Sequence, residues 1–353
     1  MLNKEQKKAS IFSGGIHIVT AAAGSGKTKT LIKRIENTIK YGGAKGEEIL
    51  ILTFSRKASE EIRSRAAQSI PEASKITAGT FHSLCYKILK TNPEHLHKTV
   101  GFTDFTIMTE DEESALLSKI ISAKIDRFLG LSVKTVLYLS GNIHRISPEI
   151  KADLDNTGIM RELDAVNLEY AEEKRKNSLL SYNDLIRYTN LILSSDLQLK
   201  KKVSDKFRYI FADEFQDTSD EDFALIRNLL PERNPNLFAV GDDWQSIYGF
   251  RNANIDYMIN PGKYFPKFKR HTLSTNYRSF REIVKISQRA IKKNKTRSTK
   301  KIKSAAGKGG TINFIAYNSF SEETDEIIKL MNVQMKINPM KSNGPVNPKS
   351  VKS

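Results

Sequence analysis

The chain has 353 residues, of which 39% are apolar and one is a cysteine, and its formal net charge is +17. This length allows two or three domains with packed cores. One cysteine excludes a disulfide framework. No run of about 18 apolar residues predicts a membrane span and no secretory signal is evident, so we expect a cytoplasmic protein without a membrane partner.

The excess of basic residues is concentrated in the last quarter of the chain. Residues 261–353 carry 21 Lys and Arg against 5 Asp and Glu, whereas residues 1–260 carry 36 against 35. A basic field of this kind favours a polyanionic partner, and nucleic acid is the common one. A solvated surface that serves only solubility is the alternative.

A glycine-containing loop at residues 21–28 is the first informative segment. It follows a largely apolar run and precedes apolar residues spaced on one helical face, which predicts strand, tight loop and helix. Such a loop, here called the phosphate loop, holds phosphate oxygens with backbone N–H groups and a helix N-terminus. Lys27 would reach the β- and γ-phosphates, and the Thr28 hydroxyl would hold Mg²⁺. The predicted nucleotide-binding residues here are Ala22, Ala23, Gly24, Ser25, Gly26, Lys27, Thr28 and Thr30, although Ala21 stands where the strict pattern has glycine.

Three later apolar runs also predict strands with polar residues at their ends. They occupy residues 49–54, 209–212 and 237–240, and the second leads directly into Asp213 and Glu214. Strands that alternate with helices predict an α/β fold with an open, mostly parallel sheet. Asp213 lies 186 residues after Lys27, which indicates that a domain is inserted between them.

These signals predict four regions. Residues 1–88 and 177–265 form a first α/β domain, and residues 89–176 form a helical insertion. A second α/β unit begins near residue 266, with strands at 271–273 and 311–315 and a helix at 281–293, and it extends to residue 337. Residues 338–353, rich in Pro, Lys, Asn and Ser, are predicted to be a disordered tail.

Taken together, the polar blocks resemble those of the UvrD/Rep family of superfamily 1 DNA helicases. The blocks start at Leu2, Ala21, Thr53, Gly79, Asp213, Gly241 and Asn276, and their order is that of the family. The block at 242–245 looks most like the helicase IV branch. The resemblance implies a P-loop, RecA-like sheet domain with an inserted helical domain and an incomplete second RecA-like domain.

The resemblance also implies roles in ATP hydrolysis. Asp213 would bind Mg²⁺ and Glu214 would act as general base or orient the attacking water, with a structural capping pair as the alternative. Gln245 would sense the γ-phosphate, and Arg278 would act as an arginine finger. Gln6 would bond adenine through its amide and Tyr277 would stack on the ring.

A second set of residues resembles the family's contacts to single-stranded DNA. Aromatic side chains supply stacking faces for bases, and short hydroxyls, backbone N–H groups and arginine suit phosphates. The alternative for Tyr248 and Phe250 is a place in the core. The predicted DNA contacts are Thr53, Phe54, Ser55, Arg56, Thr80, His82, Tyr248 and Phe250.

The favoured function is therefore an ATP- and Mg²⁺-dependent DNA helicase that translocates 3′ to 5′ on single strands. Its expected partners are single-stranded DNA, junctions of single and double strands, and DNA-repair proteins. Two late family motifs are not found, so we expect a truncated or partial chain. The alternatives are an ATP- and DNA-binding module without unwinding, and an RNA-directed motor. The basic region 292–308 would contact duplex phosphates or be a surface that the rest of the protein covers.

Overall fold

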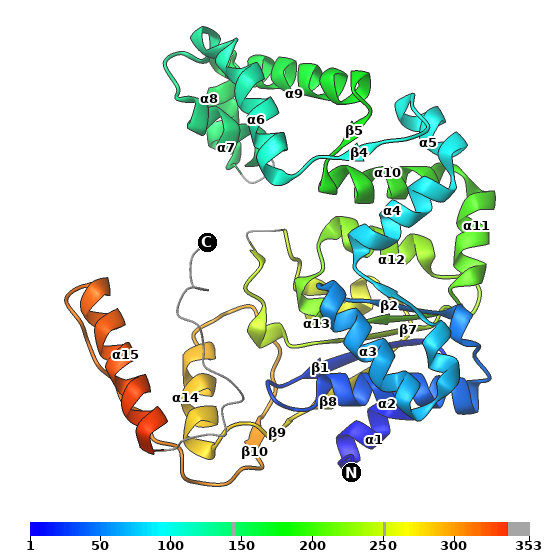
Figure 1. The fold of residues 1–353 in the computed structure, drawn as a ribbon, viewed down its shortest axis with the longest axis vertical. Helices are drawn as coiled ribbons and strands as arrows, with labels where there is room; N and C mark the ends of the chain where they lie inside the picture. Colours follow the sequence, from blue (N-terminus) through cyan, green and yellow to red (C-terminus); the bar gives the residue numbers. More distant parts are fainter. Residues whose placement is uncertain (143–145, 250–251, 338–353) are drawn as a thin grey trace. The chain divides into compact units, whose positions relative to one another are not determined.

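The computed structural model describes residues 1–142, 146–249 and 252–337 (Figure 1). Its contacts divide the chain into two units, residues 1–308 and 309–353. The first unit contains the sheet and most of the helices. The predicted disordered tail, residues 338–353, lies outside the described residues.

A six-stranded sheet forms the centre of the first unit. Its strand order is β3-β2-β6-β7-β1-β8, and every neighbouring pair runs parallel. The apolar runs at 16–21, 49–52 and 209–212 form buried strands, as fully enclosed parallel strands require. This confirms the α/β fold class. The strands are β1 (Ile16–Ala21), β2 (Ile49–Leu52), β3 (Thr77–Gly79), β6 (Tyr209–Ala212), β7 (Leu237–Gly241) and β8 (Phe268–Leu273).

Helices cover both faces of this sheet (Figure 1). Side chains alternate along each strand, so Ile18 packs in one core and Val19 in the other. Cys85 lies buried in the first core, and burial raises the pKa of its thiol to about 12. The second face carries α1 (Lys4–Ser10), α2 (Lys27–Gly42) and α3 (Arg56–Ser69); the first carries α4 (Phe81–Thr91), α5 (Pro93–Val100), α10 (Tyr182–Ser195), α11 (Leu197–Lys206) and α12 (Asp220–Leu229).

The helical insertion has an apolar core of its own. Ile121, Phe128 and Leu163 are among its buried residues, whereas Leu96 of α5 belongs to the sheet core. A two-stranded pair, β4 (Thr106–Ile107) and β5 (Leu179–Leu180), brackets the insertion where the chain leaves and returns. Its helices are α6 (Glu110–Ser122), α7 (Val133–Asn142), α8 (Pro148–Asn156) and α9 (Ile159–Lys176).

The strand expected to open a second α/β unit belongs to the first sheet instead. Residues 271–273 are the end of β8, which pairs with β1 over its full length. Its mixed, half-exposed sequence suits an edge strand, and an edge strand does not reveal its neighbour through local pattern. The chain then continues through β9 (Thr275–Asn276), α14 (Arg281–Ile291) and β10 (Lys303–Ser304), after α13 (Asp256–Ile259) has preceded β8.

The second unit is described as far as residue 337. The predicted strand at 311–315 is not formed, because no neighbouring strand pairs with it among the described residues. Phe314 is 83% exposed. The helix α15 (Phe320–Ile337) follows. None of the helices in the described ranges combines the length and apolar character needed to span a bilayer.

Candidate functional site

The predicted site residues follow strands of one parallel sheet. Because parallel strands point the same way, the segments after them emerge at a common carboxyl edge, which is where open α/β sheets bind ligands. The structure therefore gathers blocks that lie far apart in the sequence. The phosphate loop follows β1, Thr53–Arg56 follow β2, Thr80 follows β3, Asp213 and Glu214 follow β6, Gln245 follows β7, and Tyr277 and Arg278 follow β8 and β9.

The phosphate loop has the backbone that phosphate binding needs. Gly24 and Gly26 have φ angles of 63° and 79°, which side chains rarely adopt, and Gly26 is the N-cap of α2. The hydroxyl of Ser25 is buried and has no hydrogen-bond partner within the described part of the chain. A buried unpaired hydroxyl suits a ligand oxygen. Thr30 instead donates to Gly26 O at 2.9 Å, so its hydroxyl supports the loop from within.

Lys27 joins the phosphate loop to the acidic pair. Its Nζ lies 2.9 Å from Glu214 Oε2, across 187 residues of sequence. The two side chains are 13% and 40% exposed. A triphosphate entering the loop would compete with Glu214 for this ammonium.

The acidic pair is electrostatically and conformationally unusual. Burial, with the charge of Glu214 adding to it, raises the pKa of Asp213 to about 6. Glu214 has a φ of 49° in the left-handed region, which costs about 1–3 kcal/mol for a residue with a side chain. Burial also raises the pKa of Asp217 to about 6. Perturbed carboxyl groups beside a strained turn are typical of functional sites.

Gln216 connects the acidic pair to the loop after β7. Its Nε2 donates to Glu214 Oε2 at 3.1 Å and to Asp217 Oδ2 at 2.9 Å. Its Oε1 accepts from the backbone N–H of Asp242 at 2.9 Å, and Asp242 Oδ2 in turn accepts from Gln245 Nε2. The predicted γ-phosphate sensor is therefore linked to Glu214 through two intervening side chains.

Gln6 contacts the phosphate loop from α1. Its Nε2 donates to Ser25 O at 2.8 Å, while its Oε1 accepts from Asn3 N at 2.9 Å. Asn3 Nδ2 in turn donates to the hydroxyl of Tyr277 at 2.8 Å. Both ends of the Gln6 amide are thus engaged, and the predicted adenine contact would require it to exchange a partner.

Tyr277 and Arg278 lie against the phosphate loop. The Tyr277 N–H donates to Gly24 O at 2.9 Å, and a Cβ placed on Gly24 would lie 2.7 Å from Arg278 Cβ. Gly24 therefore allows this close approach. The Asn276 side chain accepts from the N–H groups of Arg278 and Ser279, both at 2.8 Å, which fixes the turn. The Arg278 side chain is exposed and begins beside this loop.

Comparison with known proteins agrees with this arrangement. The family model of the UvrD/REP helicase N-terminal domain matches residues 2–266. The chain belongs to the UvrD/Rep helicase family. It is 32% identical over 332 residues to DNA helicase II of Rickettsia typhi, covering 91% of this chain and 49% of that protein.

Two further UvrD/Rep relatives give the same picture. The chain is 30% identical over 338 residues to the ATP-dependent DNA helicase PcrA of Leuconostoc citreum, covering 94% of this chain and 44% of that protein. It is 31% identical over 331 residues to the ATP-dependent DNA helicase Rep of Buchnera aphidicola, covering 93% and 51%. The chain thus spans about half the length of these relatives. The family resemblance inferred from the motifs is confirmed, and the likeness to the helicase IV branch stays a prediction.

An aromatic stack lies among the DNA contacts predicted for this UvrD/Rep chain. Phe54, which follows β2, stacks on Tyr248 with ring centroids 5.0 Å apart and an interplanar angle of 19°. Phe54 is 49% exposed, so one aromatic face is available to a base. Tyr248 is half-buried rather than part of the core. Phe250 lies outside the described residues.

The predicted phosphate contacts are only partly free. Thr53 is buried and donates to Ser55 O at 2.7 Å. Ser55 and Thr80 are the N-caps of α3 and α4 and accept hydrogen bonds from those helices. Arg56 is exposed, and two helix N-termini remain suited to phosphate. His82 packs edge-on to Tyr182 at 5.7 Å, and burial lowers its pKa.

The residues fit ATP with Mg²⁺. Mg²⁺ commonly takes one or two protein oxygens together with phosphates and water. Thr28 beside Lys27 and the carboxylate of Asp213 beside Glu214 supply that chemistry, and the unpaired Ser25 hydroxyl leaves a site for a phosphate oxygen. Within the described ranges, no three His, Cys, Asp or Glu side chains cluster as a purely protein-bound metal would need.

Lys300 corrects one expectation. The sequence placed it in a basic region that would contact duplex phosphates or be a surface covered by the rest of the protein, but its side chain is 1% exposed and pairs with Asp242 and Asp243. Its partners lie 57 and 58 residues away, so no local pattern distinguishes it from its exposed neighbour Lys301. Sequence pattern does not show that Gln216 bridges Glu214 and Asp242, nor that Asn3 bridges Gln6 and Tyr277, because these partners are brought together by the fold.

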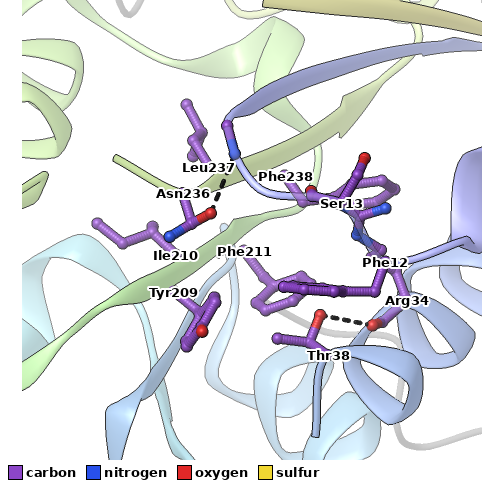
Figure 2. A pocket seen from close by; sticks show the side chains of 11 residues that line it. Phe12, Ser13, Arg34, Thr38, Tyr209, Ile210, Phe211, Asn236, Leu237 and Phe238 are labelled. Atoms are coloured by element: carbon purple, nitrogen blue, oxygen red, sulfur yellow. Dashed lines mark hydrogen bonds between the residues drawn. The ribbon is translucent and has the colours of Figure 1, made fainter. Parts of the chain in front are cut away.

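The opposite, amino edge of the sheet holds a different recess (Figure 2). Arg34 lies there between Phe12 and Phe238, with its guanidinium 5.6 and 5.4 Å from the two ring centres. It donates to Ile11 O and, at 2.6 Å, to Ser13 O. Of the predicted site residues that the structure describes, none lines this recess.

Proposed function

We propose that this chain is the ATP-hydrolysing, single-strand-binding part of a DNA helicase that moves 3′ to 5′. The proposal is supported by one observation above all. Lys27, Glu214 and the backbone of Arg278 meet at the phosphate loop, on the same sheet edge as the exposed Phe54–Tyr248 stack. The relatives named above are ATP-dependent DNA helicases and a DNA helicase II.

In the proposed hydrolysis, the phosphate loop binds the triphosphate and Lys27 moves from Glu214 to the phosphates. Thr28 and Asp213 hold Mg²⁺, which neutralises charge on the phosphates. Glu214, freed from Lys27, orients the attacking water or accepts its proton. Gln245 and Arg278 bind the γ-phosphate, and Gln6 with Tyr277 faces the adenine.

In the proposed DNA contact, bases stack on Phe54, Tyr248 and Phe250. The DNA phosphates are contacted by a second set of residues, namely Thr53, Ser55, Arg56, Thr80 and His82. Hydrogen bonds link Glu214 through Gln216 and Asp242 to Gln245. In the proposal, this link couples the state of the nucleotide to the bound DNA strand. We propose the domain limits given above, except that β8 and α5 belong to the first α/β domain, with junction DNA and repair proteins as partners and the cytoplasm as location.

A second function is favoured by one observation, the absence, among the described residues, of the strand expected at 311–315 in a second α/β unit. The chain would then bind ATP and single strands without separating a duplex. Strand displacement distinguishes the two functions, because only the helicase separates a 3′-tailed duplex with ATP.

The test is ATP hydrolysis by the whole chain with and without a single-stranded DNA oligonucleotide. We expect strong stimulation by DNA and little by an RNA of the same sequence. Absence of stimulated hydrolysis, with DNA and ATP both bound, would favour the binding module. Equal stimulation by RNA would reject a DNA-directed motor.

A further inference from the structure

Lys300 is a buried ammonium whose three donor positions are all used. Its Nζ donates to Ala21 O at 3.0 Å, to Asp243 Oδ1 at 2.8 Å and to Asp242 Oδ1. Ala21 opens the phosphate loop, and the two aspartates begin the loop after β7. Since an ammonium has three protons, this set of acceptors fixes the side chain completely.

The surroundings of Asp243 favour its carboxylate form. Burial by itself would raise the pKa of Asp243, but the positive charge of Lys300 and hydrogen bonds from Lys300 and Ser298 outweigh it and keep that pKa below its usual value. Asp243 and Asp242 have side chains that are 0% and 2% exposed. Buried charges of this kind are tolerated only while every partner is in place.

Asp242 transmits the position of Lys300 to Gln245. One carboxylate oxygen, Oδ1, accepts from Lys300 and from Trp244 N, and the other, Oδ2, accepts from Gln245 Nε2. The Gln245 side chain is otherwise exposed. Lys300 thus orients the carboxylate that holds the predicted γ-phosphate sensor.

The segment that carries Lys300 also supports Arg278. Lys303 N donates to Ser274 O at 2.9 Å and Ala305 N donates to Asn276 O at 2.8 Å, which pairs β10 with β9. Arg278 is the second residue after β9. One segment therefore contacts the phosphate loop, the loop of Gln245 and the strand before Arg278.

We propose that Lys300 is a positioning residue. It holds the carboxylate of Asp242, and this carboxylate holds Gln245 beside the phosphate loop. The inference rests on the proposed ATPase function and adds to it a lysine outside the motifs singled out in the sequence. Lys300 itself touches protein groups and is not a catalytic residue.

Trp244 provides an independent readout. It is the only tryptophan of the chain, its Nε1 donates to Ser298 O at 3.1 Å, and Lys300 Nζ lies 5.0 Å from its ring centre. Its fluorescence therefore reports on this cluster without any turnover. We expect Lys300→Met to red-shift the emission of the nucleotide-free protein, and Lys285→Met, an exposed lysine on α14, to leave it unchanged.

The test compares the kinetics of four variants. Lys300→Met is expected to lower kcat for ATP hydrolysis about a hundredfold, as misplacement of a reacting group does, while ADP affinity is kept. Lys300→Met with Asp243→Asn keeps the cluster's net charge, so it should fold and still be slow. If Lys300 acts through Gln245, Lys300→Met in a Gln245→Ala background should cause no further loss.

Two results would overturn the inference. One is a kcat equal to wild type in the folded, charge-matched double variant. The other is independent, multiplying losses from Lys300→Met and Gln245→Ala. If the wild-type chain itself hydrolyses no ATP, the proposed function fails. The role of Lys300 is then tested by the Trp244 emission and by the preference of the protein for ATPγS over ADP. If Lys300→Met changes neither the emission nor this preference, the positioning role of Lys300 is rejected.

Discussion

The two edges of the same sheet both bury a cation, yet they treat it differently. At the carboxyl edge Lys300 is surrounded by two carboxylates, and its network continues through Gln216 and Glu214 to Lys27. At the amino edge Arg34 bonds only backbone carbonyls and aromatic faces among its described contacts (Figure 2). The carboxyl edge has side chains that can exchange partners with a ligand. At the amino edge, Arg34 is already bonded to backbone carbonyls and packed against aromatic rings.

This difference indicates which edge of the sheet serves function and which serves stability. Charged side chains that pair with one another can repartner when phosphate or Mg²⁺ arrives, because a charged ligand replaces a charged neighbour. A guanidinium that donates hydrogen bonds to backbone carbonyls has no charged partner that a charged ligand would replace. Variants at the carboxyl edge should therefore change turnover, and variants at the amino edge should change folding.

The largest effect is expected from Lys27→Ala. It removes the ammonium that lies beside Glu214 and that would meet the phosphates. We expect kcat/KM for DNA-stimulated ATP hydrolysis to fall roughly a thousandfold, with the melting temperature nearly unchanged. A much lower melting temperature of this variant would show that the carboxyl edge stabilises the fold as much as the amino edge does.

Glu214→Gln is expected to separate binding from chemistry. The amide keeps the size of the side chain at the strained turn but cannot accept a proton, so hydrolysis should fall about a hundredfold or more. Equilibrium binding of ATP should persist. Unchanged turnover would reject the assigned role of Glu214.

Arg34→Met should act in the opposite way. It keeps apolar contact with Phe12 and Phe238 but leaves the carbonyls of Ile11 and Ser13 without their donor. We expect the free energy of unfolding to fall by about 2–4 kcal/mol and KM for ATP to stay the same. Arg65→Met, an exposed arginine of α3, is the matched control, with little change in either quantity.

Phe54→Ala should weaken DNA binding without touching ATP binding. Loss of one stacking face costs about 1–3 kcal/mol per base, which fluorescence anisotropy with a labelled oligonucleotide would measure. Tyr41→Ala, which removes a 67% exposed ring from α2, should leave the affinity unchanged. Equal losses in both variants would show that the stack of Phe54 on Tyr248 has no special part in DNA binding.

The last expected effect is a pH dependence from the amino edge. Burial lowers the pKa values of His17 and His271, whose rings stack at 5.2 Å, to about 4. The unfolded chain then binds more protons, so this pair should destabilise the fold as pH falls from about 6.5 towards 4. Replacing both by glutamine should reduce that slope in urea titrations, whereas an unchanged slope would exclude the pair.

The sequence predicted the parts of the site that local pattern encodes. Strand, glycine loop and Lys-Thr mark the phosphate loop, and an apolar run ending in two acids marks Asp213 and Glu214. Pattern could not say which strand lies beside which, so β8 was assigned to a second unit although it joins β1. It also could not separate buried Lys300 from exposed Lys301, because the partners of Lys300 are distant in sequence.

The short pair of β4 and β5 has a consequence for how this molecule can vary. Thr106 lies opposite Leu179, so the points where the chain departs towards α6 and returns from α9 are about 5 Å apart. A module attached through two adjoining positions can be lengthened, shortened or exchanged while the strands of the main sheet keep their register. The helical insertion can therefore vary without disturbing the sheet that carries the phosphate loop.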